Sequence, residues 1–408
     1  MRITSAVVAV GIGMVAILSA CSNRPANQVP LDSSGVTKLL DLLDTIAAKN
    51  PNLQEVEAKL AALPASSRRI LLDSLVQRNR DDRAITRAID DLLESDAYKL
   101  SYTQFKNVTP KIHREILYHL PYEAIDSPGG IADVFMELFP HRDQVRAWVT
   151  GYIPKIDINK ARARAMAWLP AGEYPLPRTY FFYDGNGDAF AQPQGIGFDL
   201  YSVLLRPIPG PHRFSGLSDR GDGQLEETLA HELHHMYSRE AIKDAPKESS
   251  PKWAGVALLS REMVSEGLAT QCNPLTGMDK EITEDPIVIA YWISDLKEHA
   301  ANFAGLPENA ASKQLWRDST YQDLAQYQKL EFLSRCFPGK RADSIAREVQ
   351  VQRPDLAHTL GRWMVKHISQ DGRDRSQAIA LLQHPDSVYV WYDRSVKDLP
   401  SEMRFVWE

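Results

Sequence analysis

The sequence predicts an α+β chain that is mostly helical, with a small sheet near the middle of its 408 residues. Apolar residues such as Val36, Leu39 and Leu43 recur at three- and four-residue intervals, which is the spacing of an amphipathic helix. Residues 179–183 (TYFFY) form a β-type run, and residues 195–205 are typical of a second strand. Helical spacing then returns and continues to the C-terminus.

The helical N-terminal region is expected to span residues 35–168. Pro51 is expected to open a second helix, since proline is well tolerated in the first turn. A third apolar stripe indicates another helix, formed by Ile85, Ala88, Ile89, Leu92 and Leu93. Nothing in this region indicates chemistry. Pro170, Pro175 and Pro177 then mark the change to a second region, residues 169–408.

Asp184 opens the sequence Asp-Gly-Asn-Gly-Asp, which is rich in turn residues. It resembles the start of a calcium loop, but Ala189 stands where such a loop needs glycine and Gly195 where it needs glutamate. We therefore predict a hairpin turn here.

The composition limits the classes of partner. Apolar residues make up 44% and charged residues 25%, which is ordinary for a folded domain. The formal net charge is −6, so the chain has no basic field to neutralise phosphates. Nucleic acid is therefore not expected as a partner.

The first 20 residues have the pattern of a secretory signal peptide. A positive start is followed by an apolar run, residues 5–18, that is short for a membrane span. The run ends in Leu-Ser-Ala before Cys21, which resembles the lipobox of bacterial lipoproteins. That resemblance implies lipidation of Cys21, a polar tether over residues 21–34, and attachment to a membrane of the bacterial cell envelope, either the outer membrane facing the periplasm or the cell surface. The alternative is an uncleaved anchor helix.

Two further cysteines, Cys272 and Cys336, are candidates for a disulfide in an oxidising compartment. The alternative is that both are buried thiols, which behave as small apolar residues. Neither alternative allows a zinc site built from cysteines.

The chemistry is expected to centre on His231-Glu232-Leu233-His234-His235, an HExxH motif. Four residues are slightly more than one helical turn, so His231 and His235 project from nearly the same side and can converge on one Zn²⁺. Glu232 lies beside that position, where it can act as a general base. Leu225, Leu229, Leu233 and Met236 form a separate apolar stripe. His234 is expected to be a surface or packing residue.

The segment Ser265-Glu266-Gly267-Leu268-Ala269 follows on a candidate helix. HELHH followed by SEGLA resembles the gluzincin metallopeptidases and uncharacterised bacterial families of predicted zinc-dependent peptidases. The resemblance implies one zinc ion per chain, held by His231, His235 and Glu266. Glu262, one turn earlier, is the rival ligand. Ser265 stands where the aminopeptidase-type members have asparagine, which leaves that outer contact open.

The same resemblance implies a downstream donor that stabilises the oxyanion. His358 is one candidate, in His-Thr-Leu-Gly-Arg-Trp-Met, and Tyr291 is the other. By analogy with gluzincins, the strand at residues 195–205 is expected to be an edge strand that pairs with the substrate backbone.

These features predict a membrane-anchored zinc peptidase whose catalytic region spans residues 169–408. Its partners would be a peptide or protein substrate and the membrane. Two alternatives remain open at this point. One is a non-catalytic envelope lipoprotein that uses the same scaffold for binding, and the other is a zinc hydrolase of non-peptide substrates.

Overall fold

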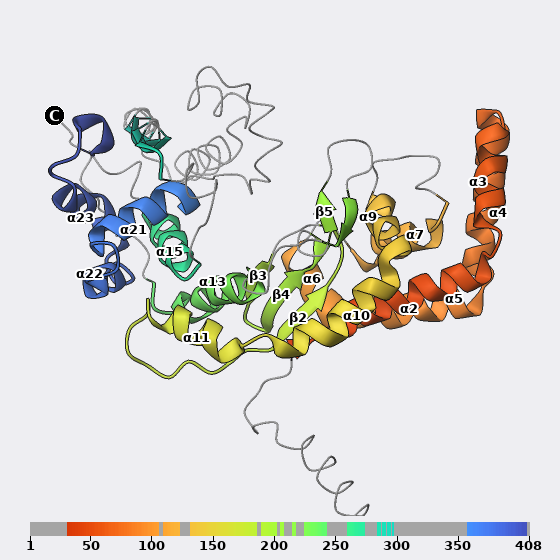
Figure 1. Cartoon of the computed structure of the whole chain (residues 1–408), viewed down its shortest axis with the longest axis horizontal. Helices are drawn as coiled ribbons and strands as arrows, with labels where there is room; N and C mark the ends of the chain where they lie inside the picture. The colour runs from red at the N-terminus through yellow and green to blue at the C-terminus, as the bar shows by residue number, and fades with distance from the viewer. Residues whose placement is uncertain are drawn as a thin grey trace, which may run out of the picture.

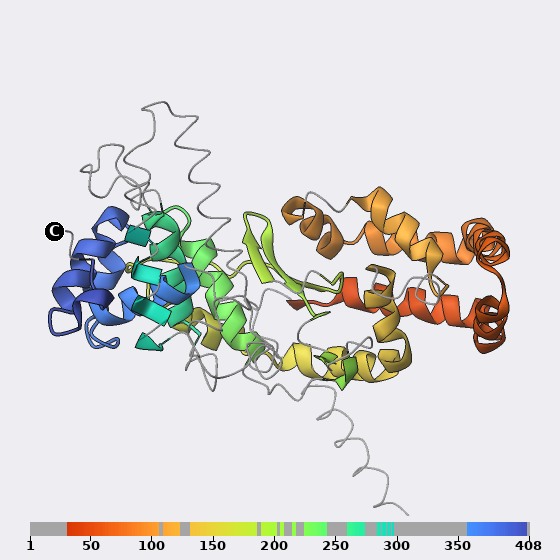
Figure 2. The same cartoon turned by 90° about the horizontal axis from the view of Figure 1, so that it is seen from above.

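The computed structural model describes the chain in segments and supports an α+β, mostly helical fold. The described residues are 31–105, 109–122, 131–185, 189–201, 205–207, 214–217, 224–242, 259–273, 284–286, 288–290, 292–294, 296–297 and 357–405. The predicted signal peptide, Cys21, Tyr291 and Cys336 lie outside them. The molecule is elongated, with the N-terminal helices at one end, the C-terminal helices at the other, and the sheet between them (Figures 1 and 2).

The N-terminal region is helical, as predicted. Its helices are α2 (Ser34–Lys49), α3 (Leu53–Ala62), α4 (Ala65–Asp81), α5 (Arg83–Leu93), α6 (Asp96–Gln104), α7 (Pro110–His119), α9 (Ile131–Leu138), α10 (Arg142–Tyr152) and α11 (Ile158–Met166), with short 3-10 helices η1 (Phe139–His141) and η2 (Ile153–Lys155). The apolar stripe of α2 is fully buried. Asp82 caps α5 by accepting hydrogen bonds from two backbone N–H groups.

The sheet has four strands in the order β1-β2-β4-β3. They are β1 (Leu31–Asp32), β2 (Thr179–Phe182), β3 (Ala189–Gln192) and β4 (Gly195–Asp199). β1 pairs with β2 and β2 with β4 in parallel, whereas β3 pairs with β4 antiparallel. The end of the predicted tether therefore forms a strand of the sheet.

The hairpin predicted at Asp184 is wrong, because β4 lies between β2 and β3. The hairpin is instead β3–β4, closed by the turn at residues 193–194. Phe190 is paired with Gly197, and its ring lies over that glycine, where any side chain would clash. This contact favours β4, rather than β2, as the neighbour of β3.

The long edge strand predicted over residues 195–205 is also wrong. β4 ends at Asp199 and is central and fully buried, and a separate strand, β5 (Leu205–Pro207), pairs with β6 (Phe214–Leu217). Among the described strands, β3 is an edge strand of the four-stranded sheet. Helix α13 (Gln224–Ser238) lies next to β3 (Figure 1).

The N-terminal helices and the sheet share one core. Tyr98 on α6 donates a 2.6 Å hydrogen bond to the carbonyl of Tyr183, and Ser101 donates one of 2.7 Å to the Asp184 carboxylate. A single cluster of buried apolar residues runs from α2 through the sheet to the C-terminal helices. Packing is therefore continuous across residue 168, where the composition changes.

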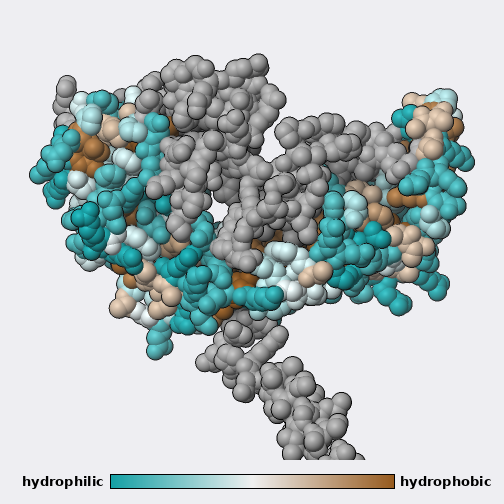
Figure 3. Space-filling view, in the orientation of Figure 1, coloured by the Kyte–Doolittle hydropathy of each residue, from teal (hydrophilic) through white to brown (hydrophobic). Residues whose placement is uncertain are grey.

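The C-terminal part is helical. After α13 come α15 (Ser260–Gln271), a π-helix η3 (Ala357–Gly361), α21 (Arg362–Ile368), α22 (Arg375–Ala380), η4 (Pro385–Ser387), α23 (Val388–Ser395) and η5 (Ser401–Met403). The described surface is largely hydrophilic on the face shown in Figure 3. In the part of the chain that the structure describes, no helix is both long enough and apolar enough to cross a bilayer.

Candidate metal centre

Helix α13 carries the two histidines of the HExxH motif and is fixed at its back and at its start. Leu225, Leu229 and Leu233 are buried, as their spacing predicts. In the first turn, Glu226 forms an ion pair with Lys160 of α11, with 2.8 Å between its Oε2 and the lysine Nζ. A carboxylate at this end of a helix is also favoured by the helix dipole. The ligand side of α13 is therefore held in a set orientation.

Helix α15 brings Glu266 against both imidazoles. Its Oε2 lies 3.4 Å from Nε2 of His231 and 3.1 Å from Nε2 of His235. The two Nε2 atoms are 2.9 Å apart. Their side chains are largely covered, with 12% of His231, 19% of His235 and 23% of Glu266 exposed. Three donor atoms from two helices thus meet at one point.

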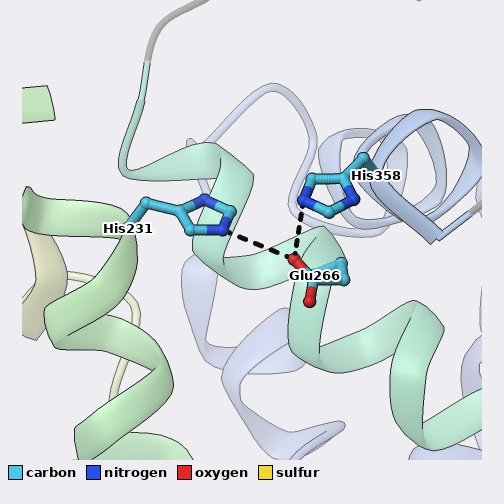
Figure 4. Close-up of side chains that lie close together, drawn as sticks. All are labelled: His231, Glu266 and His358. Atoms are coloured by element: carbon cyan, nitrogen blue, oxygen red, sulfur yellow. Dashed lines mark ion pairs between the residues drawn. The ribbon is translucent and has the colours of Figure 1, made fainter. Parts of the chain in front are cut away.

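His358 approaches the same point from the π-helix η3. Its Nε2 lies 3.0 Å from Oε2 of Glu266, and 44% of its side chain is exposed. Its ring is parallel to that of His231, with 5.6 Å between the centroids. Figure 4 shows the imidazoles of His231 and His358 both turned toward the same oxygen of Glu266. Single π-turns of this kind are frequent at functional sites.

Ser265 contacts His235 from the outer side. Its Oγ lies 3.2 Å from Nδ1 of His235, so it can hold the ring while Nε2 faces Glu266. The sequence left this contact open, because serine replaces the expected asparagine there. The one available signal was the position of Ser265 directly before Glu266. Such outer partners fix the tautomer and orientation of a metal-binding histidine.

The charges of the cluster are coupled. Burial lowers the pKa of His231 to about 4, which keeps this imidazole neutral. Burial opposes a charge on His235 as well, but the Glu266 carboxylate and, to a lesser degree, the buried Glu232 raise its pKa above the usual value. For Glu266, burial raises the pKa, yet His235 and His358 lower it well below the usual range. Glu266 is therefore ionised, as a metal ligand must be.

The remaining sequence candidates lie elsewhere or await a test. His234 is a packing residue: it is fully buried, its Nε2 is 3.3 Å from the Trp168 carbonyl, and burial lowers its pKa to about 3. Glu262 lies close enough to Tyr389 to affect its pKa. Burial raises the pKa of Tyr389, and the negative charge of Glu262 raises it further. Cys272 is buried and has no disulfide partner within the described segments. Because Cys336 falls outside those segments, the disulfide stays a prediction.

The donor set fits a small divalent cation. In a tetrahedral site with bonds of about 2.0–2.1 Å, neighbouring donor atoms are about 3.3–3.4 Å apart. The separations among His231, His235 and Glu266 are 2.9, 3.1 and 3.4 Å, close to that value. His231, Glu266 and His358 also offer donor atoms that all lie within 4.8 Å of one another. Imidazole and carboxylate are donors that Zn²⁺ accepts well.

Fold and site thus define a helical α+β protein with a His-His-Glu cluster suited to one metal ion. The chain belongs to the family described as "Putative zinc dependent peptidase (DUF5700)", whose model matches residues 61–376. That match includes the whole cluster. It agrees with the prediction of a zinc-dependent peptidase at the level of the family. No curated protein and no solved structure matches the chain.

Proposed function

We propose that this protein is a gluzincin-type metallopeptidase that hydrolyses peptide bonds with one zinc ion held by His231, His235 and Glu266. The observation that carries the proposal is the convergence of their three donor atoms within 2.9–3.4 Å of one another. The family match agrees with it. Bound zinc would acidify a water molecule and polarise the scissile carbonyl.

The protein's own residues would carry the proton and orient the reacting groups. Glu232 follows His231 directly on α13, and its carboxylate is close enough to affect the pKa of His235. A carboxylate there can accept the proton of the attacking water and pass it to the leaving amine nitrogen. Ser265 would hold His235 in register.

His358 would stabilise the developing oxyanion. It stands at the rim of the cluster, with its side chain 44% exposed and its Nε2 directed at the ligand oxygen of Glu266. An imidazole N–H in this position can donate to an oxygen that gains charge during the attack. This role would explain why residues 358–361 (HTLG) lie next to residues 265–269 (SEGLA).

The test uses full-length protein purified in detergent, with metal content and cleavage of a broad peptide library as the two measurements. We expect about one zinc per chain, as in other sites with three protein ligands. Glu232→Gln should keep the metal and lose hydrolysis, whereas His231→Ala should lose both. If Glu232→Gln cleaves peptides as fast as the parent, the proposed base is wrong. Bound zinc without cleavage of any peptide would favour a binding protein or a hydrolase of other substrates.

We also propose that a lipid on Cys21 anchors the protein to a membrane of the bacterial cell envelope. The support is the apolar run that ends in Leu-Ser-Ala-Cys, followed by a polar stretch. Cells fed a labelled fatty acid should incorporate it into the parent and not into the Cys21→Ser variant. Equal labelling of both would contradict the anchor.

A further inference from the structure

The two edges of β3 can be assigned from the hydrogen bonds of its neighbour. Ile196 on β4 donates its N–H to the carbonyl of Arg178, just before β2, so the backbone groups of Ile196 face β2. The next residue, Gly197, must then face β3, where it is paired with Phe190. Backbone groups alternate along a strand, so those of Ala191 point away from β4. The outer edge of β3 therefore presents the N–H and C=O of Ala191.

That outer edge is held by one side chain of the HExxH helix. The guanidinium of Arg239 donates a 3.2 Å hydrogen bond to the carbonyl of Ala191. Arg239 follows the last residue of α13, and its N–H still bonds the carbonyl of His235, so the helical turn continues through it. It stands four residues after His235, about 40° further round the helix, and eight after His231, about 80° further round. Arg239 thus lies one helical turn beyond His235, on the helix that packs next to β3.

The contact leaves most of the guanidinium's capacity unused. Arginine has five N–H donors, and this side chain is exposed. In the part of the chain that the structure describes, no carboxylate forms an ion pair with Arg239, and its partner is a single neutral carbonyl. A carboxylate is a stronger acceptor for a guanidinium than a carbonyl is, because the bond is charge-assisted and can be bidentate.

We propose that Arg239 is a specificity-determining residue that selects substrates carrying a carboxylate. In the peptide-free protein it covers the carbonyl of Ala191. When a peptide adds to the edge of β3, its backbone N–H takes that carbonyl, and the released guanidinium binds a carboxylate of the same peptide. Arg239 lies roughly 6 Å further along the helix axis than His235. We therefore expect the recognised group about two residues from the cleaved bond, since an extended chain rises about 3.3 Å per residue.

The carboxylate has two sources, an Asp or Glu side chain and a free C-terminus. Matched peptides separate them: one series carries Asp or Asn at each position in turn, and a second ends in a free acid or an amide. The measured quantity is the ratio of kcat/KM between the members of each pair. One charge-assisted hydrogen bond corresponds to about a tenfold or larger ratio. We expect that preference in one series for the parent, and a ratio near one for Arg239→Gln.

Two further variants sharpen the test. Arg239→Glu should reverse the preference toward a lysine at the same position, which a purely structural role for Arg239 would not produce. Arg87→Gln is the matched control, because Arg87 is an exposed arginine on α5 in the N-terminal region. It should keep the parental ratio. The proposal is overturned if the parent shows no carboxylate preference, or if Arg239→Gln retains it.

The inference rests on the proposed peptidase function, so binding is measured separately from cleavage. Fluorescence anisotropy with the same labelled peptides and the Glu232→Gln protein gives a Kd ratio that needs no turnover. Cleavage without a carboxylate preference would refute the role of Arg239 alone. The opposite outcome is also possible: the parent cleaves no peptide, yet Glu232→Gln binds the peptides with a carboxylate more tightly, and the double variant Glu232→Gln/Arg239→Gln does not. That result would refute the peptidase function and retain the role of Arg239.

Discussion

Gly267 and Gly361 touch where α15 meets the π-helix η3. A Cβ atom on Gly267 would lie 2.5 Å from the carbonyl oxygen of Gly361, closer than real Cβ contacts come. Gly267 directly follows Glu266, and Gly361 stands three residues after His358. The absence of two side chains therefore lets the backbones approach closely enough for the imidazole of His358 to reach the carboxylate of Glu266.

The first prediction concerns this contact. Gly267→Ala should force α15 and η3 apart and lower the free energy of unfolding by about 1–3 kcal/mol, as overpacking does. It should also reduce zinc affinity and activity, because Glu266 moves with the helix. Urea unfolding and competition with a zinc chelator measure the two effects.

The matched control is Gly151→Ala on α10, where an added Cβ meets nothing within 4 Å. That variant should be as stable as the parent or more so, by about 0.5–1 kcal/mol. Equal stability of Gly267→Ala and the parent would contradict the prediction.

The contact between Gly267 and Gly361 also shows which parts of the site could be predicted from the sequence and which could not. The helical spacing of α2, α5 and α13 could be predicted because it depends on residues three and four apart. His231 and His235 could be placed together from their spacing on one helix, and Glu266 was added to them by the resemblance of the Glu-Gly-Leu-Ala segment. The approach of His358 could be suggested only by resemblance, since it depends on two glycines in segments far apart in the chain.

In the sheet, the strands themselves could be predicted, but not which strands are neighbours. The predicted runs 179–183 and 195–205 contain the strands β2 (residues 179–182) and β4 (residues 195–199), but the order of the strands was not predicted. A turn-rich sequence after β2 predicts a hairpin, yet the local pattern does not say which strand becomes the neighbour. That choice depends on the packing of Phe190 over Gly197, which is a contact between strands. The edge strand was therefore predicted at residues 195–205, whereas β3 is the strand at that end of the described sheet.

The second prediction concerns Ser265. Ser265→Ala removes the hydroxyl that lies 3.2 Å from Nδ1 of His235. Loss of such an outer contact commonly costs 10–100-fold in metal affinity or activity, so we expect zinc affinity to fall by about that factor. Ser265→Thr keeps a hydroxyl and should restore most of the affinity. A zinc Kd for Ser265→Ala equal to that of the parent would show that His235 is held by other groups.

The third prediction concerns metal removal. A ligand that binds only the folded state adds stability, by about 2.7 kcal/mol at a concentration 100 times its Kd. Zinc should therefore raise the Tm of the chelator-treated parent in a concentration-dependent way. The Glu266→Gln variant should show little or no increase, because it loses the charged ligand that both imidazoles face. An equal rise in both proteins would mean that zinc binds elsewhere in the chain.

The fourth prediction separates two roles that the position of His358 allows. As an oxyanion donor, His358 contributes during the reaction and not to metal binding, so His358→Ala should keep about one zinc per chain with an unchanged Kd. Its kcat should fall by about 10²–10³, the usual effect of removing one such donor. KM should change much less, since the lost interaction develops in the transition state. The matched variant is His235→Ala, in which zinc affinity itself should collapse. If His358→Ala loses zinc as readily as His235→Ala does, then the 3.0 Å approach of its Nε2 to Glu266 marks a fourth metal ligand, and another residue must stabilise the oxyanion.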